Sequence, residues 1–257
     1  MIEWGSHSPI PTGANLPKLL KKHGYREPRD PQKFDNHTEV FGQTFFDMCT
    51  TDPVKNETFM EMMTAWQMGK VDWTQVYDTN RIVDGADLSK PLLVDVGGMH
   101  GIDMQRFLAC HPDLPEDTLF VQDVPHVLES EAHTIDGRIK KVPHDFFTSQ
   151  TIINARGYFF HAVPHDWSDA DCLRIFQNIT PAMKRGYSKI LIYEVVLPPK
   201  GANGIQAAMD GIMMLLLSSM ERTEQHWAEL LGQAGLKIVD IFRRPGASES
   251  VIEAELA

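Results

Sequence analysis

The stretch LLVDVGGMHG at residues 92–101 contains groups that can bind a nucleoside-type ligand. An apolar run leads into Asp95, and Gly97, Gly98 and Gly101 complete a D-x-G-G-x-x-G pattern. Glycines after a strand let a ligand lie against the backbone, and such turns bind nucleotides in parallel sheets. The same glycines also suit a plain tight turn, so this stretch alone leaves a structural role open.

Two further carboxylates follow later apolar runs and favour the ligand interpretation. Asp123 ends the run TLFVQD, where a carboxylate can accept two hydrogen bonds from a ribose diol, and Asp145 follows the next short run. A nicotinamide dinucleotide needs G-x-G-x-x-G, and Asp95 would repel its phosphates. An S-adenosyl cofactor has no phosphate and carries sulfonium and ammonium cations. The acidic lining therefore favours S-adenosylmethionine, with S-adenosylhomocysteine as its demethylated product.

Alternating apolar and helical stretches position these groups. The expected strands are LLVDV, TLFVQD, GYFFHAV and KILIYEVVL, and the helices between them include IDMQRFLACH, VPHVLESEA and DADCLRIFQNITPAM. This alternation predicts an α/β fold with a mostly parallel sheet and helices on both faces. LKIVDIFRR and SVIEAELA follow one another without a helix, which predicts an antiparallel C-terminal hairpin.

The N-terminal part has a different pattern. Residues 1–35, rich in proline, glycine and charge, predict an irregular lead-in, and apolar spacing predicts helices over 38–49 and 57–68. We therefore expect two regions, residues 1–90 with the lead-in and helices and residues 91–257 with the cofactor-binding sheet.

Composition and charge exclude several classes of protein. The 257-residue chain is 42% hydrophobic, and its net charge of −11 without a basic cluster argues against a nucleic-acid partner. Three scattered cysteines form no CxxC pair, and Pro164 separates His161 from His165, so no metal site is expected. The chain contains neither an apolar run of ~20 residues nor a signal-peptide pattern. We expect a cytoplasmic protein without a membrane partner.

Seven segments together resemble the fungal members of the plant-type class I O-methyltransferases. They fall in the family's order and at its spacing: LLVDVGGMHG, FVQDVPHVL, HDFF, ARGYFFHAVPHDWSDADC, ILIYEVVLP, ERTEQHWAELLGQAGLKI and SVIEAELA. The resemblance extends from about residue 16 to the C-terminus. It implies a Rossmann-like methyltransferase domain with a seven-stranded sheet, and it identifies residues 1–90 as the remnant of a dimerisation and substrate-binding region.

The resemblance also implies roles for individual residues. His165 is implied to be the general base that removes the proton of a phenolic hydroxyl, with Glu194 and Glu221 orienting it. A histidine suits this role because its ordinary pKa lies near neutrality, where a phenol is still protonated. The expected cofactor contacts are Asp95, Gly97, Gly98, Met99, Gly101, Asp123, Val124, Asp145, Phe146, His161 and Trp167.

The acceptor implied by the resemblance is a phenolic or aromatic secondary metabolite. Two methionine-rich helical stretches offer adaptable apolar walls for it, and the candidates there are Met63, Met209, Asp210 and Met213. Core packing is the alternative explanation for these methionines.

Two departures from the family pattern support a second hypothesis. Met99 stands where the family has glycine, and most of the family's N-terminal region is missing. A methyltransferase fold can be reused without methyl transfer, as a pericyclase, a cyclase or an inactive partner subunit. The short N-terminal region also leads us to expect a homodimer, or a heteromeric partner that supplies the missing part.

Overall fold

The computed structural model describes residues 2–26, 30, 34–129 and 135–257. The chain forms two compact units, and each is described by itself. Unit 1 comprises Met1–Lys70, His165–Asp169 and Leu197–Arg222, whereas unit 2 comprises Val71–Pro164, Ala170–Val196 and Thr223–Ala257. The division at residue 90 stays a prediction.

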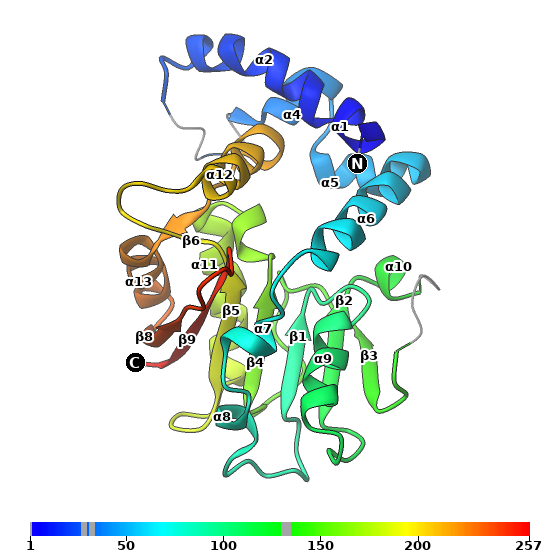
Figure 1. The fold of residues 1–257 in the computed structure, drawn as a ribbon, viewed down its shortest axis with the longest axis vertical. Helices are drawn as coiled ribbons and strands as arrows, with labels where there is room; N and C mark the ends of the chain where they lie inside the picture. Colours follow the sequence, from blue (N-terminus) through cyan, green and yellow to red (C-terminus); the bar gives the residue numbers. More distant parts are fainter. Residues whose placement is uncertain (1, 27–29, 31–33, 130–134) are drawn as a thin grey trace. The chain divides into compact units, whose positions relative to one another are not determined.

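Unit 2 contains a seven-stranded sheet of order β3-β2-β1-β4-β5-β9-β8 (Figure 1). Its strands are β1 Leu93–Val96, β2 Leu119–Asp123, β3 Ile139–Pro143, β4 Gly157–His161, β5 Lys189–Glu194, β8 Leu236–Phe242 and β9 Ser250–Leu256. The first five pair in parallel, and β9 pairs antiparallel with both β5 and β8. The predicted α/β sheet with an antiparallel C-terminal hairpin is confirmed.

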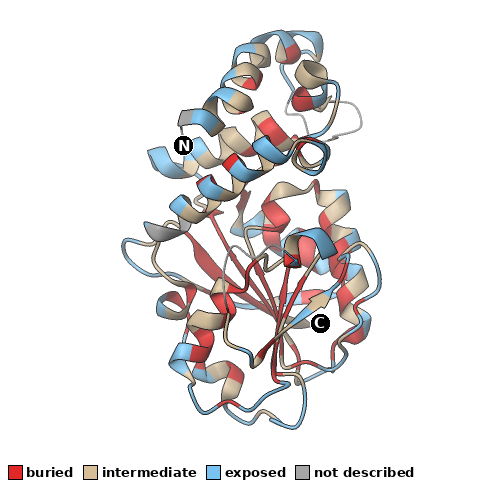
Figure 2. Cartoon of the chain, turned by 90° about the vertical axis from the view of Figure 1, so that its right-hand side faces the viewer, coloured by how far each residue is buried: buried red, intermediate tan, exposed pale blue. Residues whose placement is uncertain are grey.

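Helices on both faces of this sheet cover buried strands, which are red in Figure 2. Neighbouring residues of β4 point to opposite faces, as the two-residue period of a strand requires. The Phe159 ring lies 4.6 Å from Trp73, and the Phe160 ring lies 5.8 Å from Phe176. The helices of unit 2 are α7 Trp73–Val76, α8 Asn80–Val83, α9 Ile102–Cys110, α10 Pro125–Leu128, α11 Asp169–Ile179 and α13 Glu224–Gln233.

The predicted helix VPHVLESEA begins as α10, and its residues 130–132 lie outside the described residues. KILIYEVVL divides into β5 and a short strand β6 Val196–Leu197, which pairs with β7 Arg222–Thr223 in a separate two-stranded sheet.

Strand order reverses between β1 and β4, because the chain adds β2 and β3 on one side of β1 and then continues with β4 on the other. In open parallel sheets ligands bind at the carboxyl ends of the strands beside such a reversal. The turn after β1 and the last residue of β4, His161, lie at this position. The fold therefore places the predicted ligand-binding residues of unit 2 at one edge.

Unit 1 is helical. Its helices are α1 Ile2–His7, α2 Pro9–Lys22, α4 Asn36–Phe41, α5 Phe45–Thr51, α6 Pro53–Met68 and α12 Gly204–Leu217. Phe45, Met48 and Leu216 form its buried apolar cluster. Among the described residues no helix is long and apolar enough to cross a membrane.

Two expectations for unit 1 were wrong. Residues 2–7 and 9–22 of the lead-in are helical rather than irregular, while residues 1, 27–29 and 31–33 lie outside the described residues. Pro9 occupies a first-turn position that proline tolerates, and the Asn36 side chain donates to Thr12 O over 2.9 Å and to Leu215 O over 3.1 Å. The predicted helix 38–49 is two helices. Gly42, in the left-handed conformation with φ 76°, ends α4, and Thr44 caps α5.

Candidate active site

The glycine turn after β1 is tightly packed against its neighbours. The backbone N–H groups of Gly97 and Gly98 donate to Gln122 O over 2.8 and 3.1 Å, which fastens the turn to β2. A Cβ atom at Gly97 would lie 2.8 Å from Val163 Cγ2, and one at Gly98 would lie 2.4 Å from Asp95 Cγ. Both positions therefore require glycine, as the sequence predicts.

Met99 adopts the strained conformation that its place in the turn predicts, with φ 49°. A side chain in this region costs about 1 kcal/mol or more. The backbone offsets part of this cost, because Met99 N–H donates to Asp123 Oδ2 over 3.0 Å. Gly101, with φ 72°, precedes α9, and a Cβ there would lie 2.9 Å from Val121 Cγ2.

Asp123 connects the end of β2 to the glycine turn. Its Oδ1 accepts the Val124 N–H over 2.8 Å, and its Oδ2 accepts the Met99 N–H. Burial raises the pKa of this carboxyl group, and the two backbone donors oppose that shift. Each carboxylate oxygen has a second lone pair, so Asp123 can still accept a hydroxyl donor.

The residues after β3 place an aromatic ring beside the turn. Asp145 Oδ1 accepts the Phe147 N–H over 2.9 Å and so shapes an exposed turn. The Phe146 ring atom Cε1 lies 3.7 Å from the position of a Cβ on Gly97. Phe146 can therefore pack against a flat heterocycle that lies over the turn.

Asp95 lies beneath the turn and is 1% exposed. Within the described part of the chain, its Oδ2 accepts no hydrogen bond. Burial raises its pKa well above the ordinary value, nearby Asp103 raises it further, and His161 opposes the shift. A cation over the turn would offset this cost, so the residues fit a ligand with ammonium or sulfonium charge. Over the same described residues, no His, Cys, Asp and Glu side chains group in a way that could hold a metal ion.

His161 is at the centre of a buried charge cluster next to Asp95. Its Nδ1 lies 2.6 Å from Asp103 Oδ2, and its Nε2 lies 3.7 Å from Glu249 Oε1. Burial lowers the pKa of His161, but the attraction and hydrogen bond of Asp103, with the help of Glu249, raise it to about 9. Sequence reasoning missed Asp103 and Glu249. The only local signal was an acidic residue in the first turn of α9.

We expect this cluster to make stability depend on pH. The folded pKa of His161 exceeds its ordinary value of 6.5, so its contribution is fully present below pH 6.5 and is lost as the pH rises through about 9. The loss amounts to at most about 3 kcal/mol. Urea unfolding of the wild type at pH 6.5 and 9.5 should show it, whereas His161→Gln should show a smaller dependence. If the free energy of unfolding changed equally between pH 6.5 and 9.5 in both proteins, His161 would not be the group responsible.

His165, in unit 1, has a carboxylate near each ring nitrogen. Its Nδ1 lies 2.9 Å from Oε1 of the buried Glu221, and its Nε2 lies 3.5 Å from Asp166 Oδ1. Burial raises the pKa of Asp166 to about 6, His165 opposes the shift and Glu221 adds to it. The predicted pairing of His165 with Glu221 is thus observed. Asp166 was missed, although it directly follows His165 in the sequence.

The backbone that carries His165 is fixed by side chains from the segment after α12. Ser219 Oγ donates to His165 O over 2.5 Å and to Trp167 O over 2.9 Å. The Arg222 guanidinium donates to Trp167 O over 2.8 Å. The Trp167 ring stacks on Phe46, with centroids 5.3 Å apart and planes at 15°. Sequence reasoning did not identify Ser219, Arg222 or Phe46.

Several predicted neighbours belong to different units or helices. Glu194 is buried at the end of β5 in unit 2, so its contact with His165 stays a prediction, as does that of Trp167 with the cofactor. Met63 lies on α6, while Met209 and the buried Met213 lie on α12. Their common acceptor pocket also stays a prediction.

Comparisons with known proteins agree with this geometry. A family model described as "O-methyltransferase domain" matches residues 25–237. "O-methyltransferase ATR12" of Stachybotrys chlorohalonatus (strain IBT 40285) is 47% identical over 94% of this chain and 61% of its own length. The chain thus spans less than two thirds of that relative.

Two solved structures are similar over 98% of this chain. One, described as "A Pericyclic Reaction enzyme", has a TM-score of 0.90 and 27% identity, with 66% of its own chain covered. The other, "Crystal structure of OxaC in complex with SAH and oxaline", has a TM-score of 0.83 and 26% identity, with 64% covered. The family match, the sheet and the glycine turn lead to one conclusion: the chain belongs to the O-methyltransferase domain family.

Proposed function

We propose that this protein is an S-adenosylmethionine-dependent O-methyltransferase that acts on a phenolic hydroxyl of an aromatic secondary metabolite. The observation that carries the proposal is His165, which is 8% exposed and has a carboxylate at each ring nitrogen. This arrangement suits a base that becomes charged when it accepts a proton. Membership of the O-methyltransferase domain family supports the reaction class.

The glycine turn and its surroundings support the cofactor. Gly97 and Gly98 allow close approach to the backbone, Asp123 offers acceptors for ribose hydroxyls, and Phe146 borders the turn. The ammonium and sulfonium charges of this cofactor would further offset the burial of the Asp95 carboxylate. OxaC, a similar structure, is described in complex with SAH.

The proposed chemistry needs one proton acceptor. When bound, the cofactor supplies an electrophilic methyl group on a positively charged sulfur. His165 Nε2 would accept the phenolic proton and so leave the acceptor oxygen as the nucleophile for methyl transfer. Glu221 accepts the Nδ1–H bond, which fixes the tautomer and stabilises the imidazolium, and Asp166 adds a second negative charge. We assign Glu194 to the same task, on the family resemblance.

Three methionines support the acceptor class. Met209 and Met213 on α12, with Met63 on α6, provide apolar and polarizable surface that suits an aromatic guest. OxaC is described in complex with oxaline, and ATR12 is a fungal O-methyltransferase by name.

Two measurements test the proposal together. Isothermal titration calorimetry should show that S-adenosylhomocysteine binds, and transfer of a labelled methyl group to members of a panel of phenols should then be detected. Absence of heat at millimolar ligand would exclude the cofactor. Binding without transfer to any phenol would instead favour a function that keeps the cofactor site without methylation.

A second function, without methyl transfer, is supported by two observations. The fold is similar to that of a protein described as a pericyclic reaction enzyme, at a TM-score of 0.90. Met99 also holds a left-handed conformation in the turn, which glycine adopts at lower cost. A pericyclase, a cyclase or an inactive partner subunit would need no proton acceptor for a phenol. Methylation of a phenol that is lost in His165→Ala would therefore support the methyltransferase over the second function.

We expect Met99→Gly to raise the affinity for S-adenosylhomocysteine up to about fivefold, or about 1 kcal/mol, because it removes a side chain from the turn over which the cofactor would lie. Calorimetry on both proteins measures the change. Asn154→Gly is the matched control, since Asn154 also has a positive φ of 57° but is exposed in another loop. Equal affinity in wild type and Met99→Gly would show that the methionine does not limit cofactor binding.

A further inference from the structure

We propose that Asp210 is a positioning residue that orients the base His165 through the backbone of Glu221. The inference deepens the proposed function and rests on it for the role of His165. Sequence reasoning placed Asp210 in the acceptor pocket, which stays a prediction. Its observed hydrogen bond leads to Glu221 and so to His165.

Two consecutive hydrogen bonds connect Asp210 with His165. Asp210 Oδ1 accepts the Glu221 backbone N–H over 2.9 Å. The Glu221 side chain in turn places Oε1 2.9 Å from His165 Nδ1. All three residues belong to unit 1, so the connection lies within one compact body.

The segment between α12 and β7 needs such a support. After α12 ends at Leu217, Ser218 turns the chain with φ 51°. Ser219 then bonds the carbonyls of His165 and Trp167, and Asp210 holds the Glu221 N–H two residues later. The segment 219–221 is therefore held to the His165 backbone at one end and to α12 at the other.

The orientation of the Glu221 carboxylate depends on its backbone. The side chain is fully buried, and in the described part of the chain its Oε2 accepts no hydrogen bond. His165 is thus the principal fixed partner of this carboxylate, and the position of the Glu221 backbone determines where Oε1 lies. A shift of about 1 Å in a catalytic group can cost on the order of 100-fold in rate.

Asp210 is also the one charged residue in α12, GIQAAMDGIMMLLL. The bond to the Glu221 N–H gives this carboxylate a defined task. The same helix carries Met209 and Met213, the residues predicted to contact the acceptor. Docking of an acceptor on α12 and orientation of the base would then depend on one helix.

The test uses Asp210→Ala and Asp210→Asn in the full chain. Asparagine keeps an oxygen that can accept the Glu221 N–H, and alanine does not. The first readout is the hydrogen-bonded Nδ1–H proton of His165 in the ¹H NMR spectrum, without cofactor or acceptor, assigned by its loss in His165→Gln. We expect this resonance in the wild type and in Asp210→Asn, and we expect its loss in Asp210→Ala.

The second readout is kinetic. With the best phenol of the panel, Asp210→Ala should lower kcat about 10- to 100-fold with little change in the acceptor KM, and Asp210→Asn should restore most of it. The control is Glu61→Ala, an exposed carboxylate of α6, which should match the wild type.

Several outcomes would overturn the inference. The first is a His165 resonance that is retained in Asp210→Ala, and the second is its loss in Asp210→Asn. The third is an Asp210→Ala variant with a raised acceptor KM and an unchanged kcat, which would indicate that Asp210 contacts the acceptor. If Asp210→Ala does not fold, Asp210→Asn becomes the test. Loss of the His165 Nδ1–H resonance in that variant would overturn the inference, and its retention would support it. If the wild type methylates no phenol but the resonance is lost in Asp210→Ala and kept in Asp210→Asn, the proposed function is refuted and the positioning of His165 by Asp210 is still supported.

Discussion

His165→Ala is expected to lower kcat for methylation of a phenol by about 10²- to 10⁴-fold, the usual contribution of a general base. The dissociation constant of S-adenosylhomocysteine should change little, because His165 lies outside the glycine turn that we assign to the cofactor. Radiolabel transfer measures the first quantity, and calorimetry measures the second. A fall in kcat without a change in cofactor affinity identifies a residue that acts only in the reaction.

A control variant removes a histidine elsewhere. His126 is exposed on α10, and His126→Ala should retain the wild-type kcat. Turnover by His165→Ala at the wild-type rate would remove His165 from the mechanism and would favour the function without methyl transfer. Loss of cofactor binding in His165→Ala would instead mean that the substitution disturbs the fold.

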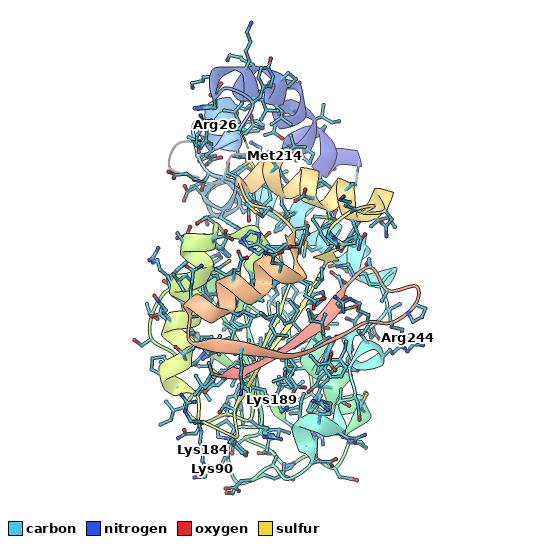
Figure 3. All side chains as sticks on the ribbon, turned by 90° about the vertical axis from the view of Figure 1, so that its left-hand side faces the viewer. Arg26, Lys90, Lys184, Lys189, Met214 and Arg244 are labelled. Atoms are coloured by element: carbon cyan, nitrogen blue, oxygen red, sulfur yellow. The ribbon has the colours of Figure 1, made fainter. Side chains whose placement is uncertain are left out.

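Glu253→Ala is expected to destabilise unit 2 by about 3 kcal/mol, because it leaves the largely buried Lys189 ammonium and Tyr77 hydroxyl without this partner. Glu253, on β9, is 0% exposed. It accepts hydrogen bonds from Tyr77 Oη over 2.7 Å, from Arg81 Nε over 2.9 Å and from Lys189 Nζ. Lys189, labelled in Figure 3, opens β5, the strand beside β9 in the sheet. Guanidinium unfolding monitored by circular dichroism measures the loss.

The same strand provides a matched control. Glu255 lies two residues further along β9 and pairs with Lys237 over 3.1 Å, but both side chains are exposed, at 37% and 58%. Exposed pairs contribute about 0 to 1 kcal/mol, so Glu255→Ala should be nearly neutral. If the two substitutions lowered the free energy of unfolding equally, burial would not determine how much Glu253 contributes to stability.

The sheet could be predicted because its signals are local. Most strands of unit 2 are short apolar runs, and helical spacing separates most of them, so the α/β class follows from the pattern alone. The strand β3, IKKVP, carries two lysines and was not among the expected strands. The glycine turn was equally visible, since Gly97 and Gly98 directly follow β1. The boundaries in unit 1 were less predictable. Gly42 interrupts a continuous apolar pattern there, and α2 carries prolines that normally indicate irregular structure.

Carboxylate partners could not be predicted, because they come from distant parts of the chain. His161 and Asp103 are 58 residues apart, His165 and Glu221 are 56 apart, and Tyr77 and Glu253 are 176 apart. The second of these pairs was anticipated only through the family resemblance. No spacing rule connects such residues, since which of them meet depends on the packing of the elements that carry them.

The sequence by itself determined the class of fold, the edge of the sheet where a ligand would bind, and the residue types available there. Those features depend on periodicity and on the conformational freedom of glycine, which act over a few neighbouring residues. Tertiary structure alone decided that Asp95 lies beneath the turn, that Asp103 and Glu249 flank His161, and that Asp210 holds Glu221. Charge interactions and hydrogen bonds depend on distances in space, and only the folded chain sets those distances.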